Sequence, residues 1–418
     1  MNRIPDNFVM PTDGDWDVNN SIIKVIGVGG GGCNAVTYMY NQKIEGCCFV
    51  VCNTDSQALM KSNVPLKIQM GEGLGAGTDP ICGRNAAMES EEQIAEKVLD
   101  NGTKMLFITA GMGGGTGTGA SPVIAKMAKD RNILTVAVVT LPFSNEGNES
   151  QSKAVDGIRE LEKNVDSLLI INNEKLYEYF GDELVQDAFP KADEVLATAV
   201  KGIIEIINKP GYINVDFHDV TNMMSGSGMA LMGCGTGTGE HRLEDAVKGA
   251  FESPLLNDFD LKTAKNVLIN ITIGKNEKGV KMSDMDRLNK LIAEHTGNAN
   301  KIKSGIIYDE DPSVGDMVKI TAIATGFDMG KLGDITDVNL GNLIIIDKDF
   351  TYVPPMQEKG AEISLPESQS IKIGFNTAAN IAKFHYSESE RPVLSLKEGA
   401  SLSELVNTPA IRRQNRNQ

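Results

Sequence analysis

The sequence has 418 residues, with 40 Lys and Arg against 56 Asp and Glu, so its formal charge is −16. This length allows two or three domains, and the 41% apolar share is typical of a folded globular protein. The negative charge disfavours a nucleic-acid partner, because neutralising phosphates needs a basic surface. Apolar runs are too short for direct membrane insertion, and the six cysteines lack the paired spacing of a zinc site, so we predict no protein-ligated metal.

The first part of the chain alternates apolar runs with helical patterns. Residues 1–20 are polar, without a signal peptide, and predict a disordered arm of a cytoplasmic protein. Strands are then expected at 22–26, 46–52, 104–109, 133–140 and 167–172, with helices at 34–40, 89–100, 121–130 and 156–164. This alternation indicates an α/β domain with a parallel sheet, which we assign to residues 21–190.

The second part has a different pattern. A helix at 192–209 is apolar around most of its circumference, so we expect residues 191–211 to lie buried between two domains. Residues 212–330 predict a smaller α+β domain, with strands at 229–232, 266–273, 305–309 and 317–324 and helices at 242–251 and 285–295. The polar stretch 331–400 predicts a linker, and 401–418 is either a frayed tail or a docking peptide that orders on a partner.

A first glycine-rich segment follows the first predicted strand. Gly27-x-Gly29-x-x-Gly32 precedes a helix and matches the dinucleotide-binding fingerprint, with Asp55 at a plausible distance for a ribose contact. Taken alone, this pattern favours an NAD-type oxidoreductase. Its physical basis is common to all nucleotide sites, since glycines let backbone N–H groups and a helix N-terminus approach phosphate.

A second segment, Gly111–Gly119, also lies between a predicted strand and a helix. Its glycines and its two threonine hydroxyls could surround several phosphate oxygens. Two such segments on neighbouring strands suggest a triphosphate, although no GxxxxGK[ST] motif is present. A third run, Gly233–Gly239, lies in the other domain, and we interpret it as a structural turn.

The residues now resemble a known family. The run from Gly111 to Gly119 is similar to the signature of the tubulin/FtsZ family, and Gly27–Asn34, Asn53–Leu59, Gly73–Gly77 and Pro142–Gly147 follow in the order expected for it. The resemblance covers about residues 20–327. It implies a Rossmann-like GTPase domain joined by a buried central helix to a smaller α+β domain, and a GTPase that polymerises into the bacterial division ring.

Recognition of a guanine base needs an acceptor for its N1–H and N2–H donors. A carboxylate can accept both hydrogen bonds, whereas adenine offers no such pair of donors. Asp193 is the candidate, although it could also be an acid that favours the start of a helix. The resemblance places Phe189 and Asn173 beside the base, and Glu146 near the ribose. The family often carries Arg at the position of Ser150, near the phosphates. The remaining predicted nucleotide contacts are Gly29, Gly30, Gly31, Gly32, Cys33, Asn34, Gly113, Gly114, Gly115, Thr116, Gly117, Thr118 and Gly119.

Hydrolysis needs an oriented water and neutralised charge, for which GTP and Mg²⁺ are the expected cofactors. The closest acids are in Asn214-Val-Asp216-Phe-His-Asp219, where Asp216 and Asp219 could hold a water or simply cap a helix. The resemblance implies that Asn214, Asp216 and Asp219 act on GTP held by the next molecule. Such a contact is heterologous, does not close, and generates head-to-tail filaments.

The resemblance also implies a partner and a place. Chains of this family end in a short peptide that binds membrane-tethering division proteins such as FtsA, and residues 401–418 are similar in character. The expected location is the cytoplasm at the mid-cell division site. Two other functions remain open from the residues: an oxidoreductase, which would have no use for Gly111–Gly119, and a tubulin-fold nucleotide binder that does not turn over.

Overall fold

The computed structural model describes residues 21–100, 102–174, 185–209, 211–213, 215–252, 264–274, 279–296, 301–309, 314–327, 374–376 and 381–383. Met1–Val338 form one compact unit and Asn339–Gln418 a second. In the second unit, β12 (Gly374–Asn376) and β13 (Ile381–Lys383) pair as an antiparallel ladder. The arm, the rest of the linker and the tail predicted above lie outside the described residues, and the predicted domain boundaries stay predictions.

One sheet of eleven strands runs through the first unit, in the order β3-β2-β1-β4-β5-β6-β8-β11-β9-β10-β7. Strands β1 to β6 are parallel, whereas β11 is antiparallel to both of its neighbours. The strands are β1 Ile23–Val28, β2 Cys48–Asn53, β3 Leu66–Gln69, β4 Met105–Gly111, β5 Leu134–Leu141, β6 Ser167–Asn172, β7 Gly211–Ile213, β8 Gly228–Gly237, β9 Asn266–Gly274, β10 Lys301–Asp309 and β11 Val318–Phe327.

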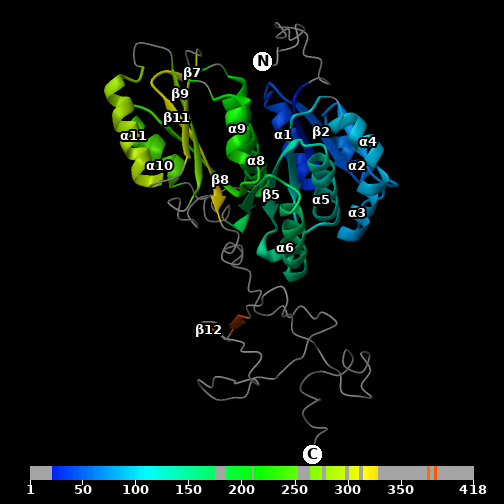
Figure 1. Ribbon diagram of the computed structural model, residues 1–418. Coiled ribbons are helices and arrows are strands. Elements are labelled where there is room, and N and C mark those ends of the chain that lie inside the picture. The colour runs from blue at the N-terminus through cyan, green and yellow to red at the C-terminus, as the bar shows by residue number, and fades with distance from the viewer. Residues whose placement is uncertain are drawn as a thin grey trace, which may run out of the picture. The chain divides into compact units, whose positions relative to one another are not determined.

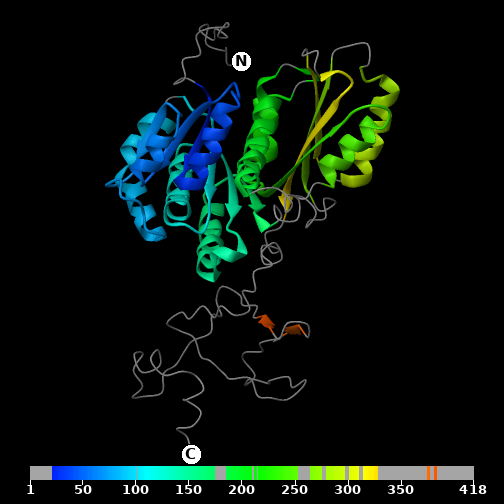
Figure 2. The same ribbon diagram turned by 180° about the vertical axis from the view of Figure 1, so that it is seen from behind.

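Helices cover both faces of this sheet, and Figures 1 and 2 show its two halves on either side of α8. No helix among the described residues has both the length and the apolar character to cross a bilayer. The helices are α1 Gly29–Asn41, α2 Ser56–Lys61, α3 Pro80–Glu89, α4 Glu91–Ile94, the π-helix η1 Ala95–Leu99, α5 Gly115–Asp130, the short 3₁₀ helix η2 Ser144–Glu146, α6 Asn148–Glu162, α8 Val185–Asn208, α9 Phe217–Met224, α10 Arg242–Phe251 and α11 Met282–Thr296.

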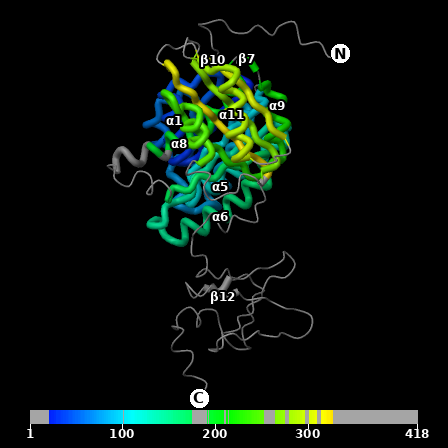
Figure 3. The backbone as a smooth tube through the Cα atoms, turned by 90° about the vertical axis from the view of Figure 1, so that its left-hand side faces the viewer, coloured from blue at the N-terminus to red at the C-terminus, as the bar shows by residue number. Residues whose placement is uncertain are grey.

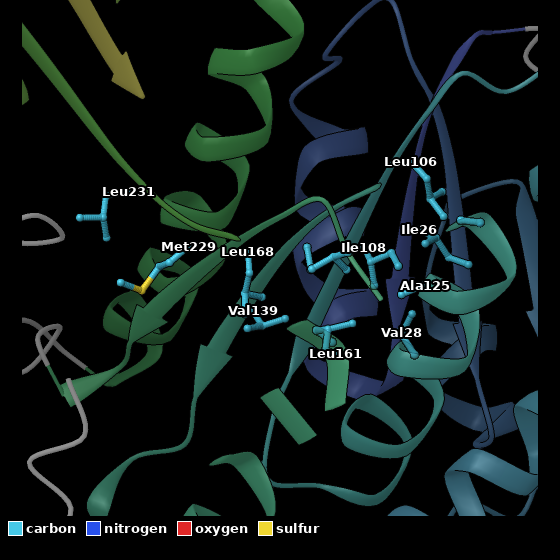
Figure 4. Close-up of a cluster of buried hydrophobic side chains, with 14 of the residues drawn as sticks. Ile26, Val28, Leu106, Ile108, Ala125, Val139, Leu161, Leu168, Met229 and Leu231 are labelled. Carbon is cyan, nitrogen blue, oxygen red and sulfur yellow. The ribbon is translucent and has the colours of Figure 1, made fainter. Parts of the chain in front are cut away.

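The core forms two layers because alternate residues of each strand point to opposite faces. On β1, Ile26 and Val28 pack in the layer that includes α5, α6, α10 and α11 (Figure 4). Ile23 and Val25 pack in the other layer, with α1, α8 and α9. Every residue of β1 is buried, as expected for a parallel strand covered on both faces.

The α/β architecture is confirmed, and several elements differ from the prediction. Helices α1 and α5 begin inside the glycine-rich segments, so glycines occupy their first turns. The predicted helix at 89–100 is divided into α4 and η1, and α8 begins at Val185, seven residues before the predicted start. The short elements β3, β7, α2 and α9 were not predicted, because they are too brief for a periodic pattern. Helix α3 has ten residues and was also not predicted, because its apolar residues form no clear stripe. The two halves share one sheet, since β6 pairs with β8.

The third glycine-rich run was predicted to be a turn, and this is wrong for most of it: Gly233–Gly237 form the second half of β8, and only Thr238 and Gly239 follow the strand. Its glycines let α10 pack directly on the strand. A Cβ at Gly235 would lie 2.1 Å from the carbonyl oxygen of Ala246, and one at Gly237 would lie 2.0 Å from that of Arg242. Glycine is therefore used here for close packing of backbone on backbone.

We expect Gly235→Ala to lower the free energy of unfolding by roughly 1–3 kcal/mol, because backbone of α10 would have to move away from the strand. Thr236→Ala is the control, since this exposed neighbour lies on the opposite face of β8. Urea denaturation of both variants tests this. Equal stability of the Gly235 variant and the native chain would contradict the packing role.

Candidate functional site

The two predicted phosphate-binding segments lie against each other. They follow β1 and β4, which are parallel neighbours in register from Ile23↔Met105 to Val28↔Ala110, so both segments leave the same edge of the sheet. A Cβ at Gly29 would lie 2.9 Å from the backbone nitrogen of Gly117. One at Gly31 would lie 3.4 Å from the Cα of Gly111. The structure thus brings Gly29–Asn34 and Gly113–Gly119 together, as the sequence predicted.

The glycines of these segments have different structural roles. Gly113 has φ +103°, and a Cβ there would lie 3.0 Å from the carbonyl oxygen of Ser150. Gly115 and Gly119 allow the start of α3 to pack closely. A Cβ at Gly115 would lie 2.9 Å from the Asp79 nitrogen, and one at Gly119 would lie 1.9 Å from the Pro80 carbonyl oxygen. In contrast, a Cβ at Gly30 or Gly114 would meet no atom within 4 Å. These two positions mark the open side of the site.

Helices α1 and α5 both begin at this open side. Neither has a side chain that caps its first turn. The unpaired N–H groups of a helix start carry a partial positive charge and attract anions. Two such helix starts side by side are suited to a ligand with more than one negative group.

The side chains of the two segments hold the site together from inside. The hydroxyl of Thr118 accepts a hydrogen bond from the backbone N–H of Gly113 at 2.9 Å, and that of Thr116 lies 2.6 Å from the hydroxyl of Thr54. The sequence assigned both hydroxyls to phosphate oxygens, whereas the structure shows them bonded within the protein. Cys33 is buried, and burial raises the pKa of its thiol to about 12, while Asn34 is exposed at the start of α1.

Asp55 is not in a position typical of a ribose-binding acid. It caps α2, because its carboxylate accepts hydrogen bonds from the backbone N–H groups of Gln57 and Ala58 at 2.8 and 3.3 Å. The loop from Gly71 to Asp79 then passes close to Gly115. The Oδ1 of Asp55 therefore serves as a helix cap, which gives this acid a structural role that needs no ribose.

Glu146 and Ser150 lie on the loop and helix that follow β5. Glu146 is exposed, and its Oε1 accepts a hydrogen bond from the backbone N–H of Phe143 at 2.9 Å. Ser150 is half-buried in the first turn of α6, beside Gly113. On the same helix, the ammonium of Lys153 donates to the carbonyl oxygen of Thr78 at 3.0 Å and pairs with Glu149 at 2.6 Å. A basic side chain that the sequence analysis did not select thus joins α6 to the loop beside Gly115.

Two polar groups, one directly after β6 and one on α8, have no protein partner among the described residues. The buried Oδ1 of Asn173 follows β6 directly and accepts no hydrogen bond. Burial raises the pKa of Asp193 to about 6, with no neighbouring cation. Asp193 is the ninth residue of α8, too far from the helix start for the macrodipole to explain it. Phe189 belongs to α8, but its side chain lies outside the described residues.

The acidic turn begins α9, and its two carboxylates cap each other's backbone. Asp216 accepts from the N–H of Asp219 at 2.7 Å, and Asp219 accepts from the N–H of Asp216 at 3.3 Å. The Asp219 carboxylate also lies 3.0 Å from the ammonium of Lys303, which lowers its pKa. The helix-cap interpretation is therefore correct, and both acids remain at the surface. Asn214 lies outside the described residues.

The acidic turn is far from the glycine-rich segments. Figures 1 and 3 place β7 and β10 toward one end of the unit and α6 toward the other. Between them runs α8, whose 24 residues span about 36 Å. A single subunit therefore does not bring Asp219 to its own site.

The described residues contain no group of three or more His, Cys, Asp or Glu side chains able to hold a metal ion. Mg²⁺ does not need such a group, because it often binds through substrate phosphates, water and one or two protein oxygens. Thr116 of the second segment and Thr54, which follows β2, offer a pair of hydroxyl oxygens 2.6 Å apart. The site is thus compatible with an ion that arrives with its nucleotide.

Comparison with known proteins agrees with this geometry. The family model for the Tubulin/FtsZ family, GTPase domain, matches residues 22–181, and that for the FtsZ family, C-terminal domain, matches 228–328. The cell division protein FtsZ of Porphyromonas gingivalis is 46% identical over 338 residues, which are 77% of this chain and 71% of that protein. FtsZ of Buchnera aphidicola from Acyrthosiphon pisum is 45% identical over 339 residues, 80% of this chain and 86% of its own.

Solved structures show the same fold. An empty FtsZ dimer from M. jannaschii has a TM-score of 0.66 and 40% identity, and covers 73% of this chain and 88% of its own. CetZ1 of Haloferax volcanii, a GDP-bound monomer, has a TM-score of 0.64 and 22% identity. The match covers 76% of this chain and 98% of the CetZ1 chain, and it supports the fold alone. The resemblance read from the glycine-rich segments is confirmed, and the chain belongs to the FtsZ family of tubulin-like GTPases.

Proposed function

We propose that the chain is a polymerising cell-division GTPase whose nucleotide lies over Gly30 and Gly114. The observation that carries the proposal is the open space at these two glycines, beside two helix starts without side-chain caps. The α- and β-phosphates would lie at α1 and the γ-phosphate at α5, where backbone N–H groups stabilise the transferred charge. Mg²⁺, held by phosphate oxygens with Thr54 and Thr116, would neutralise charge on the γ-phosphate.

Guanine specificity would come from the two unpartnered groups beside β6 and on α8. The Asp193 carboxylate accepts from guanine N1–H and N2–H, and Asn173 provides a second polar contact. Phe189 would cover the base, and the second oxygen of Glu146 would accept from a ribose hydroxyl. Adenine has no pair of adjacent donors for Asp193, so ATP should bind poorly.

Hydrolysis would require a second subunit, because the acidic turn lies at the opposite end of the molecule. In a head-to-tail contact, Asp219 would orient the attacking water, with Asp216 and Asn214 in support. Exposed apolar side chains at both ends are suited to such a contact: Leu74 and Ile81 are 88% and 67% exposed near the glycine segments, and Tyr212 is 79% exposed on β7. A contact between unlike ends repeats without closing and forms a filament.

The same proposal includes location and partner. The filament would assemble in the cytoplasm at the mid-cell division site, and residues 401–418 would bind a membrane-tethering protein such as FtsA. An oxidoreductase is disfavoured because it would leave the second glycine segment, which lies against the first, without a use. A nucleotide binder without turnover would differ from the proposed enzyme in releasing no phosphate after assembly.

Gly114→Asp should weaken GTP binding roughly tenfold or more, because its carboxylate would repel the phosphates at the start of α5. Gly114→Ala adds no charge and should have a much smaller effect. The nucleotide-free Asp variant should be at least as heat-stable as the native protein, since Asp is a favourable N-cap. Calorimetric titration and thermal melts measure both effects. Unchanged GTP affinity would place the phosphates elsewhere.

The affinity for GTP should fall roughly tenfold between pH 7 and pH 5, because protonated Asp193 cannot accept both guanine donors. The pKa of Asp193 is raised to about 6 by burial, so deprotonation before binding becomes unfavourable below that pH. Asp193→Asn removes this titration and leaves only that of the phosphates. Parallel pH profiles for the two proteins would exclude Asp193 as the base contact.

Asp219→Ala should bind GTP normally, assemble, and hydrolyse it at least about a hundredfold more slowly. Mixing it with Gly114→Asp should restore part of the phosphate release, because the first supplies a nucleotide site and the second an intact acidic turn. At a GTP concentration that fills the native site but leaves the Gly114 variant largely empty, neither variant alone should be active. If the mixture stays inactive while mixed filaments form, the active site is not shared between subunits.

A further inference from the structure

The acidic turn has a basic partner on β10. The ammonium nitrogen of Lys303 lies 3.0 Å from Oδ2 of Asp219, and the two residues are 84 positions apart in the chain (303 − 219). We propose that Lys303 is a positioning residue for GTP hydrolysis, which fixes the Asp219 carboxylate in the orientation that meets the next subunit's nucleotide. This inference rests on the proposed function of Asp219.

The backbone explains why Lys303 reaches the turn. Strand β7 is antiparallel to β10, so the chain that continues from β7 toward α9 runs beside the first half of β10. Gly305 lets it come close, since a Cβ there would lie 3.0 Å from Cγ2 of Val215 and 3.3 Å from the carbonyl oxygen of Ile213. Lys303 is two residues before Gly305 and therefore lies on the same face of the strand. Its side chain extends from there to the start of α9.

The two carboxylate oxygens of Asp219 have different contacts. Oδ2 lies 3.0 Å from the ammonium of Lys303 and accepts a hydrogen bond from the backbone N–H of Asp216 at 3.3 Å. Among the described residues, Oδ1 has no hydrogen-bond partner. A carboxylate held by one oxygen presents the other in a fixed direction, which is the arrangement needed to accept a hydrogen bond from an attacking water.

Burial and charge are consistent with this role. The side chains of Asp219 and Lys303 are 29% and 42% exposed, so a neighbouring subunit can reach the pair. The hydrogen bond from Lys303 lowers the pKa of Asp219, so the pair consists of two opposite charges at neutral pH. Because the pair is partly solvated, its loss should change the rate modestly and not abolish it.

The test compares Lys303→Ala, Lys303→Arg and Lys301→Ala in the full-length chain, with Asp219→Ala as reference. Lys301 is the matched control: it is exposed, lies on the same strand and face, and forms no ion pair with any described residue. For each variant we would measure GTP affinity, thermal midpoint, sedimented polymer, and phosphate release per polymerised subunit at saturating GTP.

We expect Lys303→Ala to release phosphate roughly two- to fivefold more slowly per polymerised subunit, with unchanged GTP affinity and thermal midpoint. Lys303→Arg should retain most of the rate, and Lys301→Ala all of it. A native rate for Lys303→Ala, beside an inactive Asp219→Ala, would overturn the role of Lys303 alone. A native rate for Asp219→Ala would overturn the proposed function and this inference with it. An equal loss in Lys301→Ala would also overturn the inference, because it would indicate a general effect of surface charge.

Discussion

The parallel pairing of β1 with β4 is the constraint on which the site depends. Since both strands end at the same edge of the sheet, α1 and α5 begin side by side there. A shift of register by one residue would turn every side chain of a strand to the other face and separate the two helix starts. Full burial of β1, in both layers of the core, stabilises the register that holds the site together.

Glycine has three uses in this chain, and the sequence alone does not separate them. Gly30 and Gly114 leave open space, Gly115 and Gly119 admit α3, and Gly235 admits α10. Runs of Gly and Thr have the same sequence pattern in all three cases, because a glycine indicates only that a side chain is excluded at that position. Whether the excluded volume belongs to a ligand or to a neighbouring helix is decided by tertiary packing. The run at Gly233–Gly239 resembled a turn for this reason, and all but its last two residues belong to a strand.

Much of the fold could be predicted because long apolar runs and amphipathic helices have clear periods, as in β5 and α10. The paired glycine segments could be predicted as well, since their order follows the strands that precede them. The partners of the site residues could not. The contacts of Lys303 with Asp219 and of Lys153 with Thr78 join residues far apart in the chain, and no local pattern marks them. The start of α8 was also placed too late, which made Asp193 look like a helix-start acid.

The junction between the two halves of the sheet has a consequence for solubility. Strand β6 pairs with β8 through Ser167↔Gly228, Leu168↔Met229 and Leu169↔Ala230, and this short ladder covers an edge rich in buried apolar side chains. Cutting the chain after β6 would expose that edge, with its unpaired backbone groups, to any other extended chain. The C-terminal half thus acts as a permanent cover that protects the GTPase half from edge-to-edge aggregation.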